Sequence, residues 1–328
     1  MTPIRSLLVA TDFSEAARHA VDRVALLSAQ LEATATLLHV DNSSRAPEPQ
    51  RRFAPLRRTS ASSSHGMVDV IARELRTAHR IDVQAETRRG DVCDQILLMS
   101  GGADLVALAS KRRNPLHRWI FGSTPGRLLG RCRRPMLVVK QAPKGPYRRV
   151  LVLTDFSAES AAAAELAACI APAAELHLFH AIGLRDETEM RFAEVPESVI
   201  RNQRMKRKAT AQIRMERTME TINPRSNRFV HAFRHGSAVP LALLKQRAID
   251  ADLLVVARRA RLIASSFPFW SVARRLSDGC ACDVLVVPAM DSSQTVSVLP
   301  QLASNSCAKK QSMRSSEPCE ALTRLLGE

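Results

Sequence analysis

Aromatic side chains are scarce in this 328-residue chain and make up only 4% of it. The hydrophobic fraction is an ordinary 45%, so a folded core has to be built mainly from alanine, leucine and valine. Small aliphatic side chains favour helices that pack closely on a sheet of aliphatic strands. The composition therefore excludes a largely unfolded chain and favours a helix-and-sheet protein.

Long apolar runs are absent too, since no stretch approaches the roughly 20 apolar residues that a membrane-spanning helix needs. The apolar stretch near the N-terminus is short and is followed by Asp12, which is not the pattern of a signal peptide. We therefore expect a cytoplasmic protein with no membrane partner.

Cysteine pairs of the C-x-x-C type are missing from the sequence. The seven cysteines are odd in number and irregularly spaced, which argues against a disulfide framework or a zinc site and for a reduced compartment. Cys280 and Cys282, in the sequence CAC, form a poor metal site on their own. A turn between a helix and a strand is the expected setting for them.

Catalytic signatures are missing as well. The sequence has no Ser/His/Asp spacing, no H-x-x-H motif and no paired carboxylate cluster that would indicate an active site. A Walker lysine motif is also absent, which makes an ATP hydrolase the least favoured reading. We expect a protein that is not an enzyme and that has no catalytic or metal-binding residues.

The sequence does contain one motif twice. TDFS occupies Thr11–Ser14 and again Thr154–Ser157, each time after a short apolar run. Farther on, RRGDVCDQILLMSGGADLVALASKR has a counterpart in RHGSAVPLALLKQRAIDADLLVVARR, and RPMLVVK has one in CDVLVVP. The same segments recur in the same order, so the chain is interpreted as a tandem duplication.

Each copy alternates short aliphatic strands with helices, which is typical of a parallel sheet covered on both faces. In the first copy we expect strands at 6–10, 35–40, 83–87, 105–108 and 136–139. The predicted organisation is a first repeat at 1–140, a linker at 141–147, a degenerate second repeat at 148–290, and a disordered polar tail at 291–328. The segment 41–66, rich in Ser, Pro and Arg, is expected to be a mobile insertion.

The net charge of +16 would favour nucleic acid, anionic lipid or acidic partners, but a generally basic, solvated surface is the preferred interpretation. The most concentrated basic segment is an expected helix at about 195–221. We expect Met205, Ala209 and Ile213 to face the sheet there. The cations expected to face water are Arg201, Arg204, Arg207 and Lys208. No recognition fold or aromatic stacking motif accompanies them, so nucleic acid is disfavoured as a partner.

In several segments the sequence resembles the universal stress protein family. The segments are LLVATDFSEAA, TLLHV, RGDVCDQIL, ADLVALAS, FGSTPGRLL and RPMLVVK, and the resemblance spans Pro3–Lys140 and Arg148–Pro288. It implies two tandem open-sheet α/β domains of the adenine nucleotide alpha hydrolase-like, Rossmann-like type, each with a five-stranded parallel sheet flanked by helices. It also implies a role in stress adaptation without enzymatic turnover.

Some members of that family bind ATP, and the resemblance implies a site in the first repeat. Asp12 matches a carboxylate at the end of the first strand, and Val40 matches the end of the second strand. The family's glycine pattern, G-x2-G-x9-G-[ST], is only partly kept. Its helix-opening part is present as Gly122, Ser123 and Thr124, where free N–H groups would attract phosphate.

The two leading glycines of that pattern are replaced by Ala109 and Arg112. Arg112 would project where phosphate would approach the bare backbone. The cations of this segment could instead supply phosphate contacts by charge, fill the pocket or face solvent; they are Lys111, Arg112, Arg113 and Arg118. Weak binding of ATP in the first repeat is therefore one hypothesis. A nucleotide-independent interaction protein is the other, since Asp12 can equally serve as a turn-capping residue.

The second repeat departs further from the pattern. Asp155 is kept, but Trp270 stands where the third glycine would be, before Ser271. An indole there is expected to block phosphate, so ATP is not expected in this repeat. His39 and His180 lie in apolar strands and are interpreted as core histidines rather than ligands.

Members of the family tend to dimerise through their last strand. By that resemblance, Met136–Val139 and Val284–Val287 are expected to pair within the chain and to cover two exposed strand edges. A homodimer and acidic protein partners are further expectations about how the chain associates.

Overall fold

The computed structural model describes most of both repeats. The described residues are 3–42, 61–110, 123–183, 185–222, 228–258 and 270–289. The expected tail at 291–328 and most of the expected insertion at 41–66 lie outside them.

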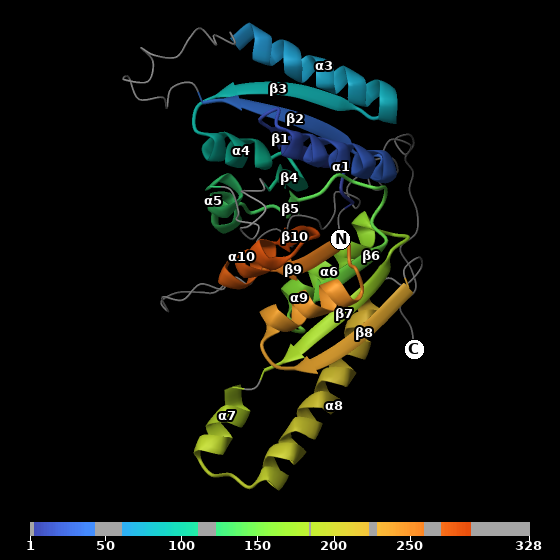
Figure 1. Ribbon diagram of the computed structural model, residues 1–328. Coiled ribbons are helices and arrows are strands. Elements are labelled where there is room, and N and C mark those ends of the chain that lie inside the picture. The colour runs from blue at the N-terminus through green and yellow to red at the C-terminus, as the bar shows by residue number, and fades with distance from the viewer. Residues whose placement is uncertain are drawn as a thin grey trace, which may run out of the picture. The chain divides into compact units, whose positions relative to one another are not determined.

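Ten strands form one sheet in the order β3-β2-β1-β4-β5-β10-β9-β6-β7-β8 (Figure 1). The first repeat supplies β1 (Ser6–Thr11), β2 (Thr34–Asp41), β3 (Val83–Arg89), β4 (Leu105–Ala109) and β5 (Met136–Val139). The second supplies β6 (Arg149–Leu153), β7 (Glu175–Ile182), β8 (Arg228–His235), β9 (Leu253–Ala257) and β10 (Asp283–Val287). Within each repeat the paired strands are parallel, which confirms the predicted α/β class.

Helices cover both faces of the sheet, and strand residues alternate between the two cores. Leu7 and Val9 of β1 join one core and Leu8 joins the other. The first core is covered by α1 (Glu15–Leu31), α3 (Ala61–His79), α6 (Ala158–Ile170) and α8 (Glu197–Thr221). The second is covered by α4 (Val92–Ser100), α5 (Ser123–Arg131), α9 (Ala238–Ala248) and α10 (Trp270–Gly279). A further helix, α7 (Arg185–Phe192), precedes α8.

Two helices differ from what the sequence pattern indicates. α3 begins at Ala61, within the segment expected to be irregular. The sequence pattern did not indicate this start, because the buried apolar residues that the structure describes in this helix begin only at Val68. In α8, Met205 and Ile213 are 72% and 52% exposed. The residues that face the sheet are Ile200, Ala211 and Met215, so the predicted orientation of this helix is wrong. Ala209, also expected to face the sheet, is exposed as well.

The two repeats meet where β5 and β10 pair in antiparallel fashion. Val138 lies opposite Val284, and Leu137 lies opposite Leu285. Both leucines are fully buried. Neither repeat exposes its last strand as an open edge here, because each strand completes the hydrogen bonding of the other.

A buried polar cluster lies beside this pair. Asp283, at the start of β10, is 3% exposed and accepts hydrogen bonds from the Tyr147 hydroxyl at 2.7 Å and the Lys140 backbone N–H at 2.9 Å. Arg23 of α1 places Nε 3.4 Å from the Asp283 carboxylate and its guanidinium 4.0 Å from the centre of the Tyr147 ring. Burial raises the pKa of Asp283, and the Arg23 charge opposes that shift. The first repeat and the linker thus supply the groups that hold a buried carboxylate of the second.

Two cations, the buried Lys140 and the half-buried Arg258, also cross between the repeats. The Lys140 ammonium donates to the carbonyls of Ser277 and Cys280 at the end of α10. The Arg258 guanidinium donates to the carbonyls of Leu129 and Cys132 at the end of α5. Each cation satisfies carbonyls that a helix leaves unpaired and lies at the negative end of the helix dipole.

Removal of the single tyrosine hydroxyl tests this cluster. In Tyr147→Phe the ring stays over Arg23, but a buried carboxylate loses one donor, so we expect a loss of about 1–3 kcal/mol in the free energy of unfolding. Tyr147→Leu also removes the ring and should cost about 2 kcal/mol more. Urea unfolding followed by circular dichroism measures both. A phenylalanine variant as stable as the parent would contradict the role given to this hydrogen bond.

Candidate functional site

The repeated TDFS motif forms the turn between the first strand of each repeat and the following helix. Asp12 Oδ1 accepts hydrogen bonds from the backbone N–H of Ser14, at 3.1 Å, and from the Ser14 hydroxyl. Ser14 in turn caps α1 by accepting from the backbone N–H of Ala17 at 3.3 Å. Asp12 is exposed and lies directly beside the N-terminus of α1. The carboxylate therefore orders the turn and faces solvent from it.

The phenylalanine of the motif has a defined role that sequence reasoning missed. Phe13 has φ of 60°, a left-handed conformation that is uncommon for a bulky residue. Its ring packs on the His39 imidazole with centroids 4.4 Å apart. His39 Nδ1 lies 3.0 Å from the Thr11 carbonyl oxygen, so one hydrogen bond fixes the imidazole under the phenyl ring. The sequence signal for this contact was weak: Phe13 follows the first strand by two residues, and the second strand contains His39.

The second repeat reproduces this arrangement closely. Phe156 has φ of 63° and packs on His180 with the same 4.4 Å between centroids. His180 Nδ1 lies 2.8 Å from the Thr154 carbonyl oxygen. Asp155 Oδ1 accepts from the Ser157 backbone N–H at 3.0 Å. Both histidines are thus bonded to backbone, in agreement with their interpretation as core histidines.

Three of the residues predicted for the first-repeat site lie at one edge of the sheet. Asp12 follows β1, Val40 is near the end of β2, and Ala109 ends β4. β1 lies between β2 and β4, with Thr11 opposite His39 and Val9 opposite Ala107. Their carboxyl ends therefore lie side by side. The strand order reverses between β1 and β4, because the chain runs from β1 to β2 on one side and from β4 to β5 on the other. In open α/β sheets, ligands bind in the crevice outside such a point.

The other predicted residues are less completely described. Ser123 and Thr124 form the first turn of α5, as expected of a helix-opening pair, but only their backbone is described. Arg112 and Gly122 lie outside the described residues. Whether these four residues complete a phosphate site with Asp12 stays a prediction.

In the second repeat, described residues line two cavities at the equivalent edge. One, of about 370 Å³, is lined by Asp155, Phe156 and His180 from the turn and the second strand. The other, of about 280 Å³, shares Asp155 and His180 and extends to Val256 and Val272. The Trp270 side chain, expected to close this site, lies outside the described side chains, so that closure stays a prediction.

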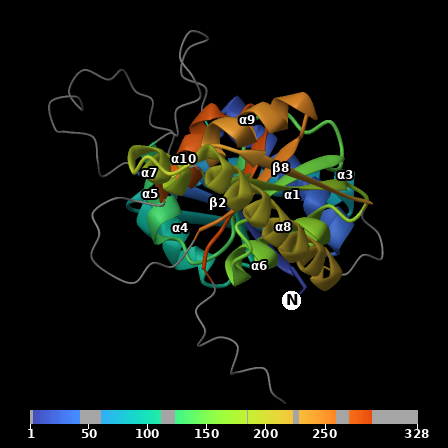
Figure 2. The same ribbon diagram turned by 90° about the horizontal axis from the view of Figure 1, so that it is seen from below.

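Cations from α8 line the larger cavity, which the predicted orientation of α8 did not suggest. Lys206, Arg207 and Arg214 contribute to its wall, together with Gln203 and Thr210. Arg207 was expected in solvent, and it is instead half-buried. The sequence did contain a signal for this orientation. Ile200, Ala211 and Met215 lie on one face of the helix, and Arg204 and Arg207 fall on the same face between them. α8 lies at the β8 end of the sheet (Figure 2).

Burial sets the electrostatics of the second-repeat histidine. Desolvation lowers the pKa of His180, and its hydrogen bond to the Thr154 carbonyl partly opposes this. The imidazole is therefore held neutral at the base of the turn. Its hydrophobic neighbours and its backbone hydrogen bond suit a positioning role better than proton transfer.

Other classes of site find no support in the described residues. They contain no group of three or more His, Cys, Asp or Glu side chains able to hold a metal ion. Across the same described ranges, no helix has the length and apolar character needed to cross a membrane.

The fold defines a class of protein that has two doubly wound α/β units joined through their last strands. Each unit has a candidate ligand crevice at its strand switch point, beside Asp12 in the first repeat and Asp155 in the second. The model of the Universal stress protein family matches residues 3–140 and again residues 146–288. The chain therefore belongs to the universal stress protein family, which confirms the resemblance seen in the sequence.

Solved structures share this tandem architecture. A universal stress protein from Archaeoglobus fulgidus DSM 4304 is 18% identical with a TM-score of 0.65, over 86% of this chain and 98% of that one. A functionally unknown protein from Pseudomonas aeruginosa PAO1 is 20% identical with a TM-score of 0.59, over 87% of this chain and 92% of that one. At these identities the likeness shows the fold alone. No curated protein matches the sequence.

The lowered pKa of His180 makes a prediction about pH. A histidine whose pKa is below the unfolded value of 6.5 favours the folded state only while it is neutral. This contribution to stability should be fully present above that value and should fall as the pH drops below about 6.5 toward the lowered pKa of His180. In His180→Asn, which keeps a donor near the Thr154 carbonyl, the fall should be smaller.

Thermal unfolding across this pH range provides the measurement. The exposed His65 supplies the matched control, and His65→Gln should keep the pH dependence of the parent. Burial also lowers the pKa of His177, so His180→Asn should reduce the dependence without abolishing it. Equal slopes for the parent and His180→Asn would show that His180 stays solvated in the folded protein.

Proposed function

We propose that this chain is a cytoplasmic, non-enzymatic stress-response protein that binds an adenine nucleotide weakly in its first repeat. The observation that carries the proposal is the position of Asp12. This exposed carboxylate directly follows β1 beside the N-terminus of α1, and the neighbouring strands β2 and β4 carry Val40 and Ala109 near their carboxyl ends. A carboxylate there can accept hydrogen bonds from sugar hydroxyls, and a helix N-terminus favours anions.

The Phe13–His39 pair supports the same proposal. Its stacked rings are partly buried, with Phe13 packed on the first core, and Phe13 immediately follows Asp12 in the turn. Aromatic faces of this kind stack well on planar rings such as nucleobases. A carboxylate for the sugar and an apolar platform for the base are the two features that a nucleoside site needs most.

Titration calorimetry with ATP tests the proposal on the full chain. We expect binding in the parent, and Asp12→Ala should weaken it by about tenfold or more, because a hydrogen bond to a charged group contributes about 1.5–3 kcal/mol. Asp155→Ala is the matched control, since it occupies the same turn in the second repeat and should leave the heat of binding unchanged. Phe13→Leu should also weaken binding while the cap at Ser14 is kept.

The outcomes separate the two repeats. Loss of binding in Asp155→Ala, with Asp12→Ala unaffected, would move the site to the cavity lined by Lys206, Arg207 and Arg214. No heat with the parent at millimolar ATP would reject nucleotide binding altogether.

A second candidate function is that of a nucleotide-independent interaction protein. The outward surface of α8 favours it, because the exposed Met205 and Ile213 lie among the exposed cations Arg201, Lys206 and Lys208. An apolar and basic surface suits an acidic protein partner with apolar anchors. Fluorescence anisotropy with labelled acidic peptides distinguishes this function, since Met205→Asp should weaken binding without affecting the ATP titration.

A further inference from the structure

Two cysteines of the second repeat lie next to each other in a buried turn. Cys280 and Cys282 occupy the segment between α10 and β10, as their sequence context predicted. Their Sγ atoms are 2.9 Å apart, and the side chains are 0% and 5% exposed. In this geometry a small movement of either side chain brings the sulfurs to bonding distance.

The surroundings shift the pKa values of the two thiols in opposite directions. The hydrogen bond from Cys282 and the positive charge of Lys140 lower the pKa of Cys280 against the effect of burial. Burial and the neighbouring Cys280 raise the pKa of Cys282. The pair thus consists of one sulfur whose anion is stabilised and one that keeps its proton, which suits a nucleophile next to a resolving thiol.

Lys140 is held against this turn by the joint between the repeats. Its ammonium donates to the carbonyls of Ser277 and Cys280, and its backbone N–H donates to Asp283 at 2.9 Å. Gln141 adds a bond from Nε2 to the Ala281 carbonyl at 2.7 Å. The end of the first repeat therefore supplies the cation closest to the sulfur pair.

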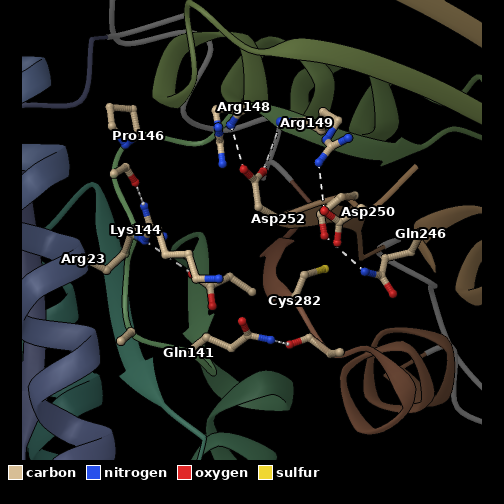
Figure 3. Close-up of a pocket in the computed structure, with 15 residues that line it drawn as sticks. Arg23, Gln141, Lys144, Pro146, Arg148, Arg149, Gln246, Asp250, Asp252 and Cys282 are labelled. Carbon is tan, nitrogen blue, oxygen red and sulfur yellow. Dashed lines mark hydrogen bonds and ion pairs between the residues drawn. The ribbon is translucent and has the colours of Figure 1, made fainter. Parts of the chain in front are cut away.

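A cavity of about 190 Å³ reaches the turn from the linker side (Figure 3). Cys282 is among its lining residues, with Gln141, Lys144 and Arg148 around it. A water molecule takes about 30 Å³ in the liquid, so this space admits a molecule of the size of hydrogen peroxide. The lining includes Cys282 but not Cys280, so a small oxidant in this cavity meets Cys282 first, and the Cys280 sulfur lies 2.9 Å from the Cys282 sulfur.

The first repeat offers an internal comparison. Cys132 occupies the position equivalent to Cys280 and is also buried, but Arg134 stands where the second repeat has Cys282. Cys132 Sγ donates only to the Arg134 carbonyl at 3.5 Å. The two copies of this turn thus differ in the feature that disulfide chemistry requires.

We propose that Cys280 and Cys282 are a dithiol that hydrogen peroxide oxidises to a disulfide. The Cys280 thiolate attacks one peroxide oxygen. The S–O bond forms, the O–O bond breaks, and the departing hydroxide takes a proton to become water. The Cys282 sulfur then attacks the resulting sulfenic acid. The S–S bond forms, the S–O bond breaks, and hydroxide leaves as water with the Cys282 proton.

In this sequence two thiols and one peroxide give one disulfide and two waters, and the sulfur pair loses the two electrons that peroxide gains. A thiol reductant restores the pair. Transient disulfides of this kind are the usual form in reducing compartments.

Mass spectrometry of the full chain tests the assignment. The reduced protein is exposed to hydrogen peroxide, the free thiols are alkylated, and peptides from combined trypsin and chymotrypsin digestion are mapped. We expect the peptide with Cys280 and Cys282 to lose two hydrogens and to escape alkylation, with reversal by dithiothreitol. Cys132, the internal control, should stay alkylated. Alkylation of all three to the same extent at every peroxide concentration would overturn the proposal.

Variants identify the order of the steps. Cys282→Ser should accumulate a sulfenic acid on Cys280, detected with dimedone, whereas Cys280→Ser should react much more slowly at Cys282. Lys140→Met should slow oxidation by about tenfold, because the Cys280 thiolate loses the positive charge that lowers its pKa. Lys144→Met, on the cavity lining, should stay close to the parent rate.

Circular dichroism confirms that each variant is folded before its rate is compared. If Lys140→Met does not fold, the two serine variants still decide the assignment. Dimedone labelling of Cys282 rather than Cys280 would reverse the order of attack and reject the sequence of steps proposed.

Discussion

The antiparallel pairing of β5 with β10 is the contact on which the rest of the described structure depends. Each repeat ends in a short strand, fully apolar in β5 and apolar after Asp283 in β10, that would otherwise expose a row of unpaired backbone groups. Pairing these strands turns two five-stranded sheets into one sheet of ten. The covalent linkage of the repeats lets this contact form at a high effective concentration.

Burial of charge beside the paired strands makes their union specific. Asp283, Lys140 and Arg258 are each removed from most of the solvent, and each finds its partners across the boundary between the repeats. A buried charge that loses its partner is strongly destabilising. Another register of the two strands would separate these charges from their partners and would carry that cost in free energy. The polar cluster thus selects one arrangement, while the aliphatic strands supply most of the burial.

The duplication has let the two copies diverge while the same turn is retained. The Thr-Asp-Phe-Ser turn, its left-handed phenylalanine and the histidine beneath it are nearly superimposable in their contacts. Differences accumulate around that turn: α8 brings basic side chains to the second copy, and Cys282 stands where the first copy has Arg134. Local backbone geometry constrains the turn, whereas the residues around it are free to acquire separate chemistry.

The sequence by itself determined the fold class, the duplication, the strands and the residues of the first-strand turn, because aliphatic runs and a repeated motif are local signals. Only the tertiary structure decided which face α8 buries, how Phe13 meets His39, and that Lys140 reaches Cys280. These contacts join residues far apart in the chain, and their partners are chosen by strand order and helix rotation. A repeated TDFS therefore indicated two equivalent turns but not their different surroundings.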